Sequence, residues 1–409
     1  MRLKSNWLRA AALALATVAV ADSNAASATT YILTQLTAPG RAGFASISLT
    51  GLNEAGQISG FGRRADGSTQ SLFWNSGQTE GQVIQALSGL SSVTAGINES
   101  GQIVGTRTSA GGIKAAFTYN IGTNQLTEIL SGVTVGNSIN DSGFVVGSQT
   151  LLGLNSGPIT SGFVYNPNTG TTEFYGLPSN AKSAEFNAIT NDGHIIGSRT
   201  PVDGPVPAQH GVFVLDNAAA TIPDGPFDQI RRTDFVAANN AGQFALNFSF
   251  PGAPFFINFV SLANLDGTNN PAGLGTLPGD SANYGGGFND QLDFVGESYN
   301  ENRYGGSYGD AIITTIGGGT LKLADLVTNL DTNFLQQGNF INNRGQILAF
   351  GFGSNGERAS FLLTPDNFVT GPGVPEPASW ALMIVGFGLV GGSVRKGRAK
   401  QAALGCALD

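Results

Sequence analysis

Few side chains in this sequence suit acid–base or metal chemistry. Its 409 residues include two histidines, His194 and His210, and a single cysteine, Cys406. His194 occupies a repeated position at which other copies carry Gln, so a solvent-facing repeat position explains it better than a metal ligand, and His210 is interpreted in the same way. The sequence contains no nucleophile elbow, phosphate-binding loop or zinc-binding HExxH motif. We therefore predict no catalytic residue, no metal and no cofactor.

Three aspartates, Asp141, Asp192 and Asp290, lie in short turns that contain glycine or its replacement. Asp is common in turns because its carboxylate hydrogen-bonds the local backbone. Calcium binding would need several converging oxygen ligands, and the sequence contains no Asp-x-Asp-x-Asp-Gly loop. We therefore interpret these aspartates as turn residues that hydrogen-bond the local backbone.

A glycine-rich stretch over residues 297–310 concentrates aromatic and polar side chains. Aromatic faces stack on ligands, and amide or guanidinium groups donate hydrogen bonds at low entropic cost, as sugar-binding or protein-binding loops require. We define a candidate ligand loop by five residues: Tyr299, Asn300, Arg303, Tyr304 and Tyr308. The alternative is a long loop that binds nothing.

One motif recurs seven times and organises the middle of the chain. Its copies cover residues 52–60, 97–105, 139–147, 189–197, 238–246, 288–296 and 341–349. The anchoring positions are Gly56, Gly101, Gly143, Gly193, Gly242, Leu292 and Gly345. Their spacings of 42 to 53 residues are the length of one propeller blade.

The motif predicts a turn followed by a strand. Asn three residues before Gly suits a turn in which Asn bonds the backbone and Gly takes a left-handed conformation. The clearest pairs are Asn53 with Gly56, Asn98 with Gly101, Asn140 with Gly143, and Asn342 with Gly345. An alternating strand follows each turn, and an apolar strand returns ten to twenty residues later.

Four short strands in each unit predict an all-β fold, a seven-bladed β-propeller over residues 29–366. A strand at 31–36 precedes the first turn without a unit of its own, whereas the seventh unit lacks a last strand. We expect this N-terminal strand to complete the seventh blade and close the ring. A parallel β-helix is the competing architecture, although its rungs are usually shorter.

The repeat resembles the HAF repeat of bacterial extracellular proteins, whose units run I-N-x-x-G-x-I-x-G and then an A-F strand. Residues 97–105 followed by Ala116 and Phe117 carry this pattern. The fifth copy has Leu246 in place of the second glycine, and the sixth has Leu292 in place of the turn glycine. These departures leave the geometry of the fifth and sixth units open.

The N-terminal residues have the layout of a secretory signal peptide. Arg2, Lys4 and Arg9 precede an apolar run over 10–20, and small residues offering A-x-A cleavage sites follow. We predict a signal peptide over 1–28 and export of the rest of the chain.

The C-terminal residues predict a linker over 367–374 and a membrane-spanning helix over 378–394. This stretch contains no charged residue, and a basic cluster that includes Arg395 and Lys396 follows it. Together with the signal peptide, it places an apolar helix at each end of the chain.

The end of the chain, 375–409, resembles the PEP-CTERM sorting signal. The matching residues are Pro375, Glu376, Pro377, Trp380 and the basic Arg395 and Lys396. The resemblance implies recognition by an exosortase, transient anchoring in the inner membrane, cleavage near Pro-Glu-Pro and transfer to the cell surface or matrix.

Net charge narrows the choice of partners. Outside residues 1–28 and 375–409 the chain holds 13 basic and 25 acidic residues, a formal balance of −12. Such a surface repels nucleic acid and anionic lipid. The sequence leaves the oligomeric state open.

Together these patterns predict a non-enzymatic surface or matrix protein whose loops bind exopolysaccharide. One alternative is an extracellular hydrolase or lyase that acts on carbohydrate, with carboxylates converging at the central channel of the propeller. Clustering of two or more inward-facing carboxylates would favour this enzyme. Another alternative is a structural module whose loops bind nothing.

Overall fold

In a computed structural model of the chain, the described residues are 29–40, 43–153, 157–176, 181–201, 211–216, 219–221, 232–249, 258–264, 269–300, 309–316 and 318–368. The chain divides into a compact unit, Met1–Asp366, and a second unit, Asn367–Asp409. Both predicted terminal helices lie outside the described residues, so the fold below is that of the first unit.

The described residues form seven four-stranded sheets, and the all-β class is confirmed. The first sheet contains β2 (Ser46–Leu52), β3 (Ile58–Arg63), β4 (Thr69–Trp74) and β5 (Gln82–Val83). The second contains β6 (Ser91–Ile97), β7 (Gln102–Thr108), β8 (Lys114–Asn120) and β9 (Gln125–Gly132). The third contains β10 (Thr134–Ile139), β11 (Val145–Gly153), β12 (Gly157–Asn166) and β13 (Thr171–Phe174). The fourth sheet contains β14 (Ala181–Ile189), β15 (Ile195–Pro201), β16 (Gly211–Asp216) and β17 (Ala219–Thr221). The fifth contains β18 (Arg232–Ala238), β19 (Gln243–Ser249), β20 (Asn258–Asn264) and β21 (Asn269–Gly273). The sixth contains β22 (Ala282–Phe288), β23 (Phe294–Tyr299), β24 (Asp310–Thr315) and β25 (Gly319–Lys322).

The seventh sheet joins the two ends of the unit. It contains β26 (Phe334–Ile341), β27 (Ile347–Phe352), β28 (Arg358–Pro365) and, on its outer side, β1 (Tyr31–Leu36). The β1–β28 ladder is antiparallel and runs from the Tyr31–Pro365 pair to the Leu36–Ser360 pair. A 3₁₀ turn η1 (Gln85–Leu87) and the one-turn helix α1 (Leu323–Leu326) are the helical segments of the described residues.

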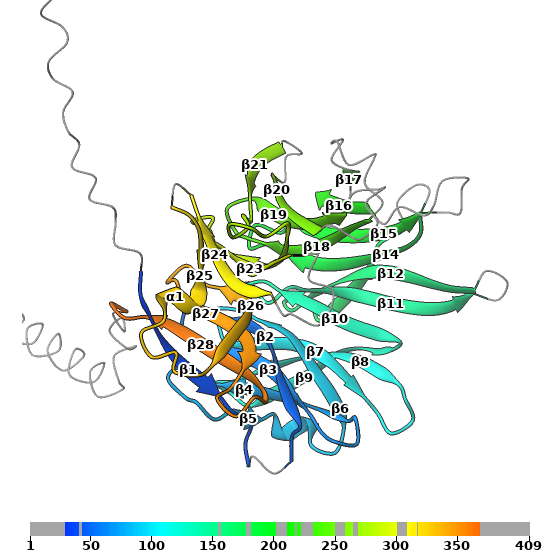
Figure 1. The fold of residues 1–409 in the computed structure, drawn as a ribbon. Helices are drawn as coiled ribbons and strands as arrows, with labels where there is room; N and C mark the ends of the chain where they lie inside the picture. The colour runs from blue at the N-terminus through cyan, green and yellow to red at the C-terminus, as the bar shows by residue number, and fades with distance from the viewer. Residues whose placement is uncertain are drawn as a thin grey trace, which may run out of the picture. The chain divides into compact units, whose positions relative to one another are not determined.

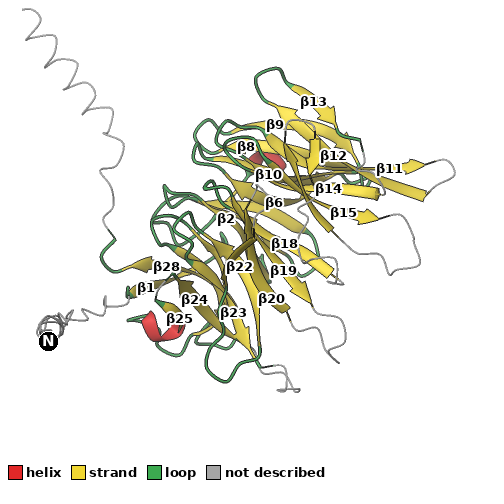
Figure 2. Cartoon of the chain, turned by 90° about the horizontal axis from the view of Figure 1, so that it is seen from above, coloured by secondary structure: helices red, strands yellow, loops and turns green. Residues whose placement is uncertain are grey.

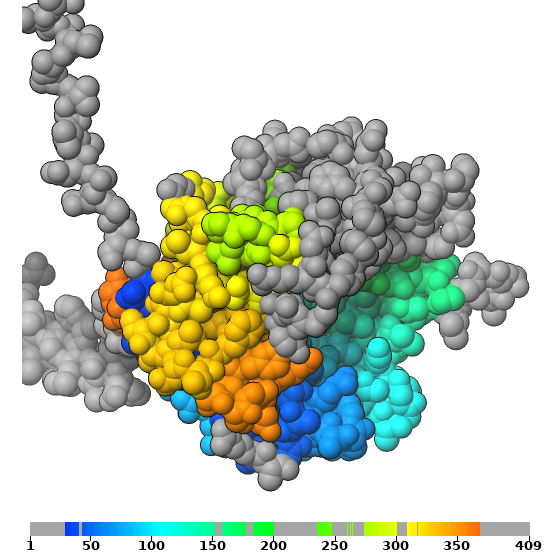
Figure 3. Space-filling model, viewed as in Figure 1, coloured from blue at the N-terminus to red at the C-terminus, as the bar shows by residue number. Residues whose placement is uncertain are grey.

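In six sheets each strand pairs antiparallel with the next strand of the chain, and in the seventh β1 pairs antiparallel with β28. A parallel β-helix does not have this pattern. Consecutive sheets contact each other, for example β3 with β6, and β2 also contacts β26 and β28 of the seventh sheet. Figure 1 shows the sheets following one another in chain order, and Figure 2 shows them from above. In the space-filling view, the orange surface of the seventh sheet adjoins the blue surface of the first (Figure 3).

The second glycine of the repeat allows close approach of two strands. A β-bulge interrupts the first strand of the second sheet between Thr94 and Gly96. A Cβ on Gly105 would lie 2.3 Å from the carbonyl oxygen of Val93, and one on Gly147 would lie 2.0 Å from that of Val135. No side chain fits at these distances, so the glycine is required by packing of the main chain.

The core lies between adjacent sheets. One buried cluster combines Val104 and Ala116 of the second sheet with Val145 and Phe163 of the third. The phenylalanines of the returning apolar strands, including Phe117, Phe163 and Phe361, are fully buried. Burial of such side chains contributes about 1.5–3 kcal/mol each, which fixes the orientation of the sheets and therefore of the turns at their ends.

Candidate functional site

The turn at the start of each second strand has the geometry that the repeat predicts. In the second copy, the Gly101 amide donates to the Asn98 carbonyl at 3.1 Å, and the Gln102 amide donates to Asn98 Oδ1 at 2.8 Å. Gly101 has a φ of 69°. The sixth copy keeps this turn although Leu292 replaces glycine, because Leu292 takes a φ of 63° and its amide still donates to the Asn289 carbonyl at 3.1 Å.

A first set of hydrogen bonds links the turns of successive sheets. In six of the seven turns the first residue is Asn, and its Nδ2 donates to the main-chain carbonyl of the first residue of the next turn. These bonds are Asn53 to Asn98 (3.0 Å), Asn98 to Asn140 (2.9 Å), Asn140 to Thr190 (3.1 Å), Asn239 to Asn289 (3.3 Å), Asn289 to Asn342 (3.3 Å) and Asn342 to Asn53 (3.1 Å). The last bond returns from the seventh turn to the first.

A second set of bonds runs through the next residue of each turn. Its amide donates to the side chain of the equivalent residue in the following turn, and the seventh residue donates to the first. We call these seven residues the polar ring: Glu54, Glu99, Asp141, Asn191, Asn240, Asp290 and Asn343. The donor–acceptor distances lie between 2.8 and 3.0 Å.

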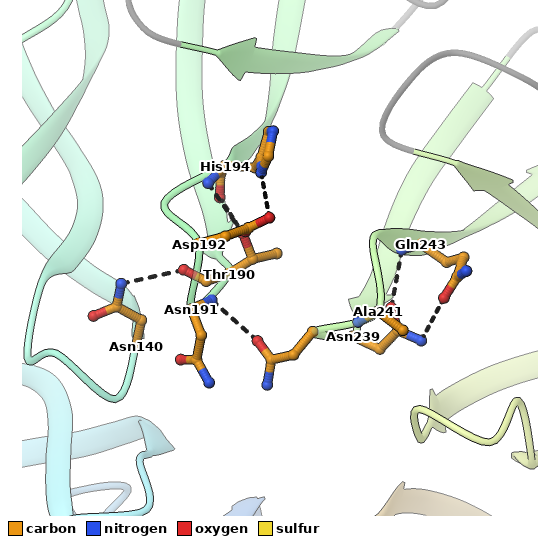
Figure 4. Close-up of polar contacts among 9 residues, drawn as sticks. Asn140, Thr190, Asn191, Asp192, His194, Asn239, Ala241 and Gln243 are labelled. Carbon is orange, nitrogen blue, oxygen red and sulfur yellow. Dashed lines mark hydrogen bonds and ion pairs between the residues drawn. The ribbon is translucent and has the colours of Figure 1, made fainter.

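The fourth turn departs from this pattern (Figure 4). Thr190 has no side-chain amide to donate to the next turn, and its hydroxyl instead donates to the Asp192 carboxylate. The other oxygen of that carboxylate lies 2.9 Å from His194 Nδ1. His194 is thus partly buried beside an acid, and the first set of bonds is interrupted between the fourth and fifth turns.

The polar ring surrounds a cavity of about 260 Å³, the central pocket. Residues from all seven turns line it, including the carboxylates Glu54, Glu99, Asp141 and Asp290. No Lys, Arg or His is among these lining residues. Arg344 lies beside one of the lining residues, because its Nη1 donates to the Glu54 carbonyl at 3.1 Å.

Two of these carboxyl groups have perturbed acidities. Burial raises the pKa of Glu54, and the charge of Asp290 adds to this effect against the opposing amides of Asn343 and Arg344. Partial burial also raises the pKa of Glu99, with further contributions from the negative charges of Glu54 and Asp141. A raised pKa favours the protonated form of a carboxyl group, which is the form that a proton donor needs.

The two described residues of the candidate ligand loop do not line the central pocket. Tyr299 ends β23 and Asn300 follows it, and Asn300 Nδ2 donates to the Gly279 carbonyl at 2.9 Å. The rest of the candidate ligand loop, Arg303, Tyr304 and Tyr308, lies outside the described residues, as does His210. So do the sorting-signal residues Pro375, Glu376, Pro377, Trp380, Arg395 and Lys396.

Two kinds of feature are absent from the described part of the chain. There, no three His, Cys, Asp or Glu side chains gather closely enough to hold a metal ion. Within the same residues, no helix has the length and apolar character needed to cross a membrane.

No family model matches the chain, and no curated protein matches its sequence. Several solved structures share its fold. The β-propeller domain of the Trilobed protease from Pyrococcus furiosus, described as having an open velcro topology, is 9% identical with a TM-score of 0.51, over 81% of this chain and 98% of that one. An oligogalacturonate lyase in complex with manganese is 10% identical with a TM-score of 0.54, over 83% and 97%. The acylaminoacyl peptidase of Pyrococcus horikoshii is 11% identical with a TM-score of 0.52, over 78% of this chain and 51% of that one.

The chain therefore has a β-propeller fold. At these identities the likeness concerns the fold alone, and propellers carry many activities.

The prediction of a non-enzymatic protein is wrong in the light of these findings. The similar propellers belong to peptidases and a lyase, and four carboxylates converge on one pocket, the feature that favours the enzyme alternative. Sequence reasoning missed Glu54 and Glu99 because each glutamate by itself resembles a solvated turn residue.

Proposed function

We propose that this chain is an extracellular carbohydrate-active hydrolase built on a closed, seven-bladed propeller. The closed ring is supported by the seven sheets, by the position of β1 in the last sheet and by the polar ring, whose bonds return from Asn343 to Glu54. Closure matters for function because it brings side chains from all seven turns to one pocket.

The observation that carries this proposal is the convergence of Glu54, Glu99, Asp141 and Asp290 on the central pocket. Glycoside hydrolysis needs one carboxyl group that holds a proton and a second that is ionised. The raised pKa values of Glu54 and Glu99 suit them to the first role. Asp141 and Asp290 are the candidates for the second role.

In the proposed reaction, the protonated glutamate gives its proton to the glycosidic oxygen as the bond from that oxygen to the anomeric carbon breaks. A water molecule adds to the anomeric carbon, and the ionised aspartate accepts the proton that this water loses. The products are two shorter sugars, each with a complete set of hydroxyl groups.

Hydrolysis fits the pocket better than elimination. A lyase that removes the proton next to a uronate carboxylate must stabilise the negative charge of the intermediate, commonly with a cationic group. No Lys or Arg is among the residues that line the central pocket, and Arg344, which contacts the main-chain carbonyl of Glu54, is not one of them.

Export and sorting are part of the proposal. The basic and apolar pattern of residues 1–28 supports secretion, and the PEP-CTERM-like residues 375–409 support sorting by an exosortase. The HAF-like repeats support an extracellular location. An exopolysaccharide of the cell surface is then the accessible substrate.

The proposal is tested by measuring new reducing ends released from a panel of exopolysaccharides by the full chain. We expect Glu99→Gln to lower the rate by about 10² to 10⁴, because a glutamine cannot transfer the proton. Glu128→Gln is the matched control, since Glu128 is an exposed glutamate of β9 paired with Arg107 outside the pocket. Full activity in both Glu54→Gln and Glu99→Gln would refute the catalytic assignment.

A further inference from the structure

A second cavity, of about 360 Å³, opens between the third and fourth sheets, and we call it the radial groove. Ile189 and Asn191 line both the radial groove and the central pocket, so the two cavities adjoin. Val164 and Ile195 contribute apolar surface. A chain-like substrate whose scissile bond lies in the central pocket would therefore extend into the groove.

Tyr175 provides the groove with an aromatic surface. It follows β13 and is partly exposed. Its ring meets Phe186 edge-on, with centroids 5.4 Å apart and planes at 60°. This contact restricts the orientation of the Tyr175 ring before a ligand arrives, and an oriented aromatic ring binds the apolar face of a sugar at low entropic cost.

The polar groups of the groove match a sugar better than a peptide. Ser142 and Asp192 contribute a hydroxyl and a carboxylate to the lining, groups that pair with neighbouring sugar hydroxyls. An extended peptide is usually held instead by main-chain bonds to a free strand edge, and the lining residues of the groove come largely from turns.

The charge of the two cavities selects the kind of sugar. Asp192 lines the groove, and Asp141 and Asp290 line the adjoining pocket beside the two glutamates. No Lys or Arg lines either cavity, and the titratable group beside Asp192 is His194 at 2.9 Å. A uronate polymer would meet repulsion here, whereas a protonated amine would be attracted.

We propose that the radial groove is a subsite for a unit of a cationic amino-sugar polymer. The sugar ring stacks on Tyr175, and its ammonium group pairs with Asp192. This inference rests on the proposed function and narrows its substrate class to glycans with free amino groups.

The test is calorimetric titration of the full chain with glucosamine tetramer, its N-acetylated form, galacturonate tetramer and tetralysine. We expect the glucosamine tetramer to bind about five- to tenfold more tightly than the neutral N-acetylated form, and less tightly as salt is added. Tyr175→Ala should weaken this binding about tenfold. Phe174→Ala is the matched control, because Phe174 is the adjacent exposed aromatic and does not line the groove.

Asp192→Asn provides a second variant and should remove the preference for the amine over its acetylated form. Thermal unfolding of each variant identifies any loss of fold. If Asp192→Asn disrupts its turn, the binding measured for Tyr175→Ala tests the inference.

Four results would overturn the inference: no binding of the glucosamine tetramer, equal binding of the N-acetylated form, tight binding of galacturonate, or equal binding of tetralysine, which would indicate a basic peptide. Binding as expected together with full activity in both Glu54→Gln and Glu99→Gln would refute the catalytic assignment but not the subsite.

Discussion

The hydrogen bond that joins the seventh turn to the first can be tested by replacing Asn342. This residue is 4% exposed, and its Nδ2 donates to the Asn53 carbonyl at 3.1 Å. Its Oδ1 accepts from the Gln346 amide at 2.9 Å. Asn342→Ala removes these bonds, together with those to Gln346 Oε1 at 3.0 Å and from the Arg344 amide at 3.2 Å, and leaves the buried Gln346 amide without its side-chain partner.

The expected cost follows from these contacts. Leaving a buried donor unpaired costs about 1–3 kcal/mol, and losing a second bond adds about 1 kcal/mol. The total of roughly 2–4 kcal/mol corresponds to a fall in Tm of about 3–6 °C for a domain of this size. Asn342→Thr should cost only about 1 kcal/mol, because in the natural fourth turn the Thr190 hydroxyl still accepts from the His194 amide at 3.0 Å.

The assay is thermal unfolding of the full chain, with Asn98→Ala as the matched control. Asn98 makes the same bonds, to Asn140 and Gln102, between the second and third turns. If the ring is closed in solution, Asn342→Ala and Asn98→Ala will lower the Tm by similar amounts. A normal Tm for Asn342→Ala beside a lowered one for Asn98→Ala would show that the first and last turns are not joined.

Two further predictions concern packing and pH. Gly147→Ala should destabilise the fold by about 3 kcal/mol in urea unfolding, because its Cβ would lie 2.0 Å from the Val135 carbonyl oxygen. The control is Gly122→Ala, whose Cβ would make only an ordinary contact at 3.4 Å. Equal losses of stability in the two variants would contradict the packing argument. Burial raises the pKa of Glu297, so the folded state holds this proton more tightly than the unfolded state. The stability that it contributes is complete below the unfolded pKa of about 4.3 and is lost as pH rises through the folded pKa. Glu297→Gln should therefore gain stability relative to the wild type between pH 4 and pH 7 in the same assay, and a constant difference would be evidence against the shift.

The repeat could be predicted from the sequence because each turn is stabilised by hydrogen bonds between residues that are close together in the chain. Asn98 and Gly101 satisfy the turn by themselves, so their spacing predicts it without knowledge of the tertiary structure. At Leu292 the sequence left the geometry of the turn open. The hydrogen bond from the Leu292 amide to the Asn289 carbonyl and the packing of Leu292 against the neighbouring core hold this residue at a positive φ.

The site was harder to predict, because its residues meet only through the tertiary arrangement. Glu54 and Glu99 are 45 positions apart, and their amide-to-carboxylate bond depends on how the first two sheets pack. Each residue looked like an ordinary turn side chain, and the low number of histidines favoured a binding protein over an enzyme. The candidate ligand loop could be proposed because its aromatic and polar residues lie close together in the sequence. The carboxylates of the central pocket are distant in the sequence, so their convergence could not be predicted.

The pairing of β1 with β28 has a consequence for the order of events in synthesis. The first strand to be made finds its partner more than 320 residues later, so the sheet that unites both termini forms only after nearly the whole domain has emerged. Until then the earlier sheets make up an arc with two unpaired flanks, and contacts of such long sequence separation form slowly. A domain with this connectivity completes its last sheet later than one whose last unit is built from adjacent strands.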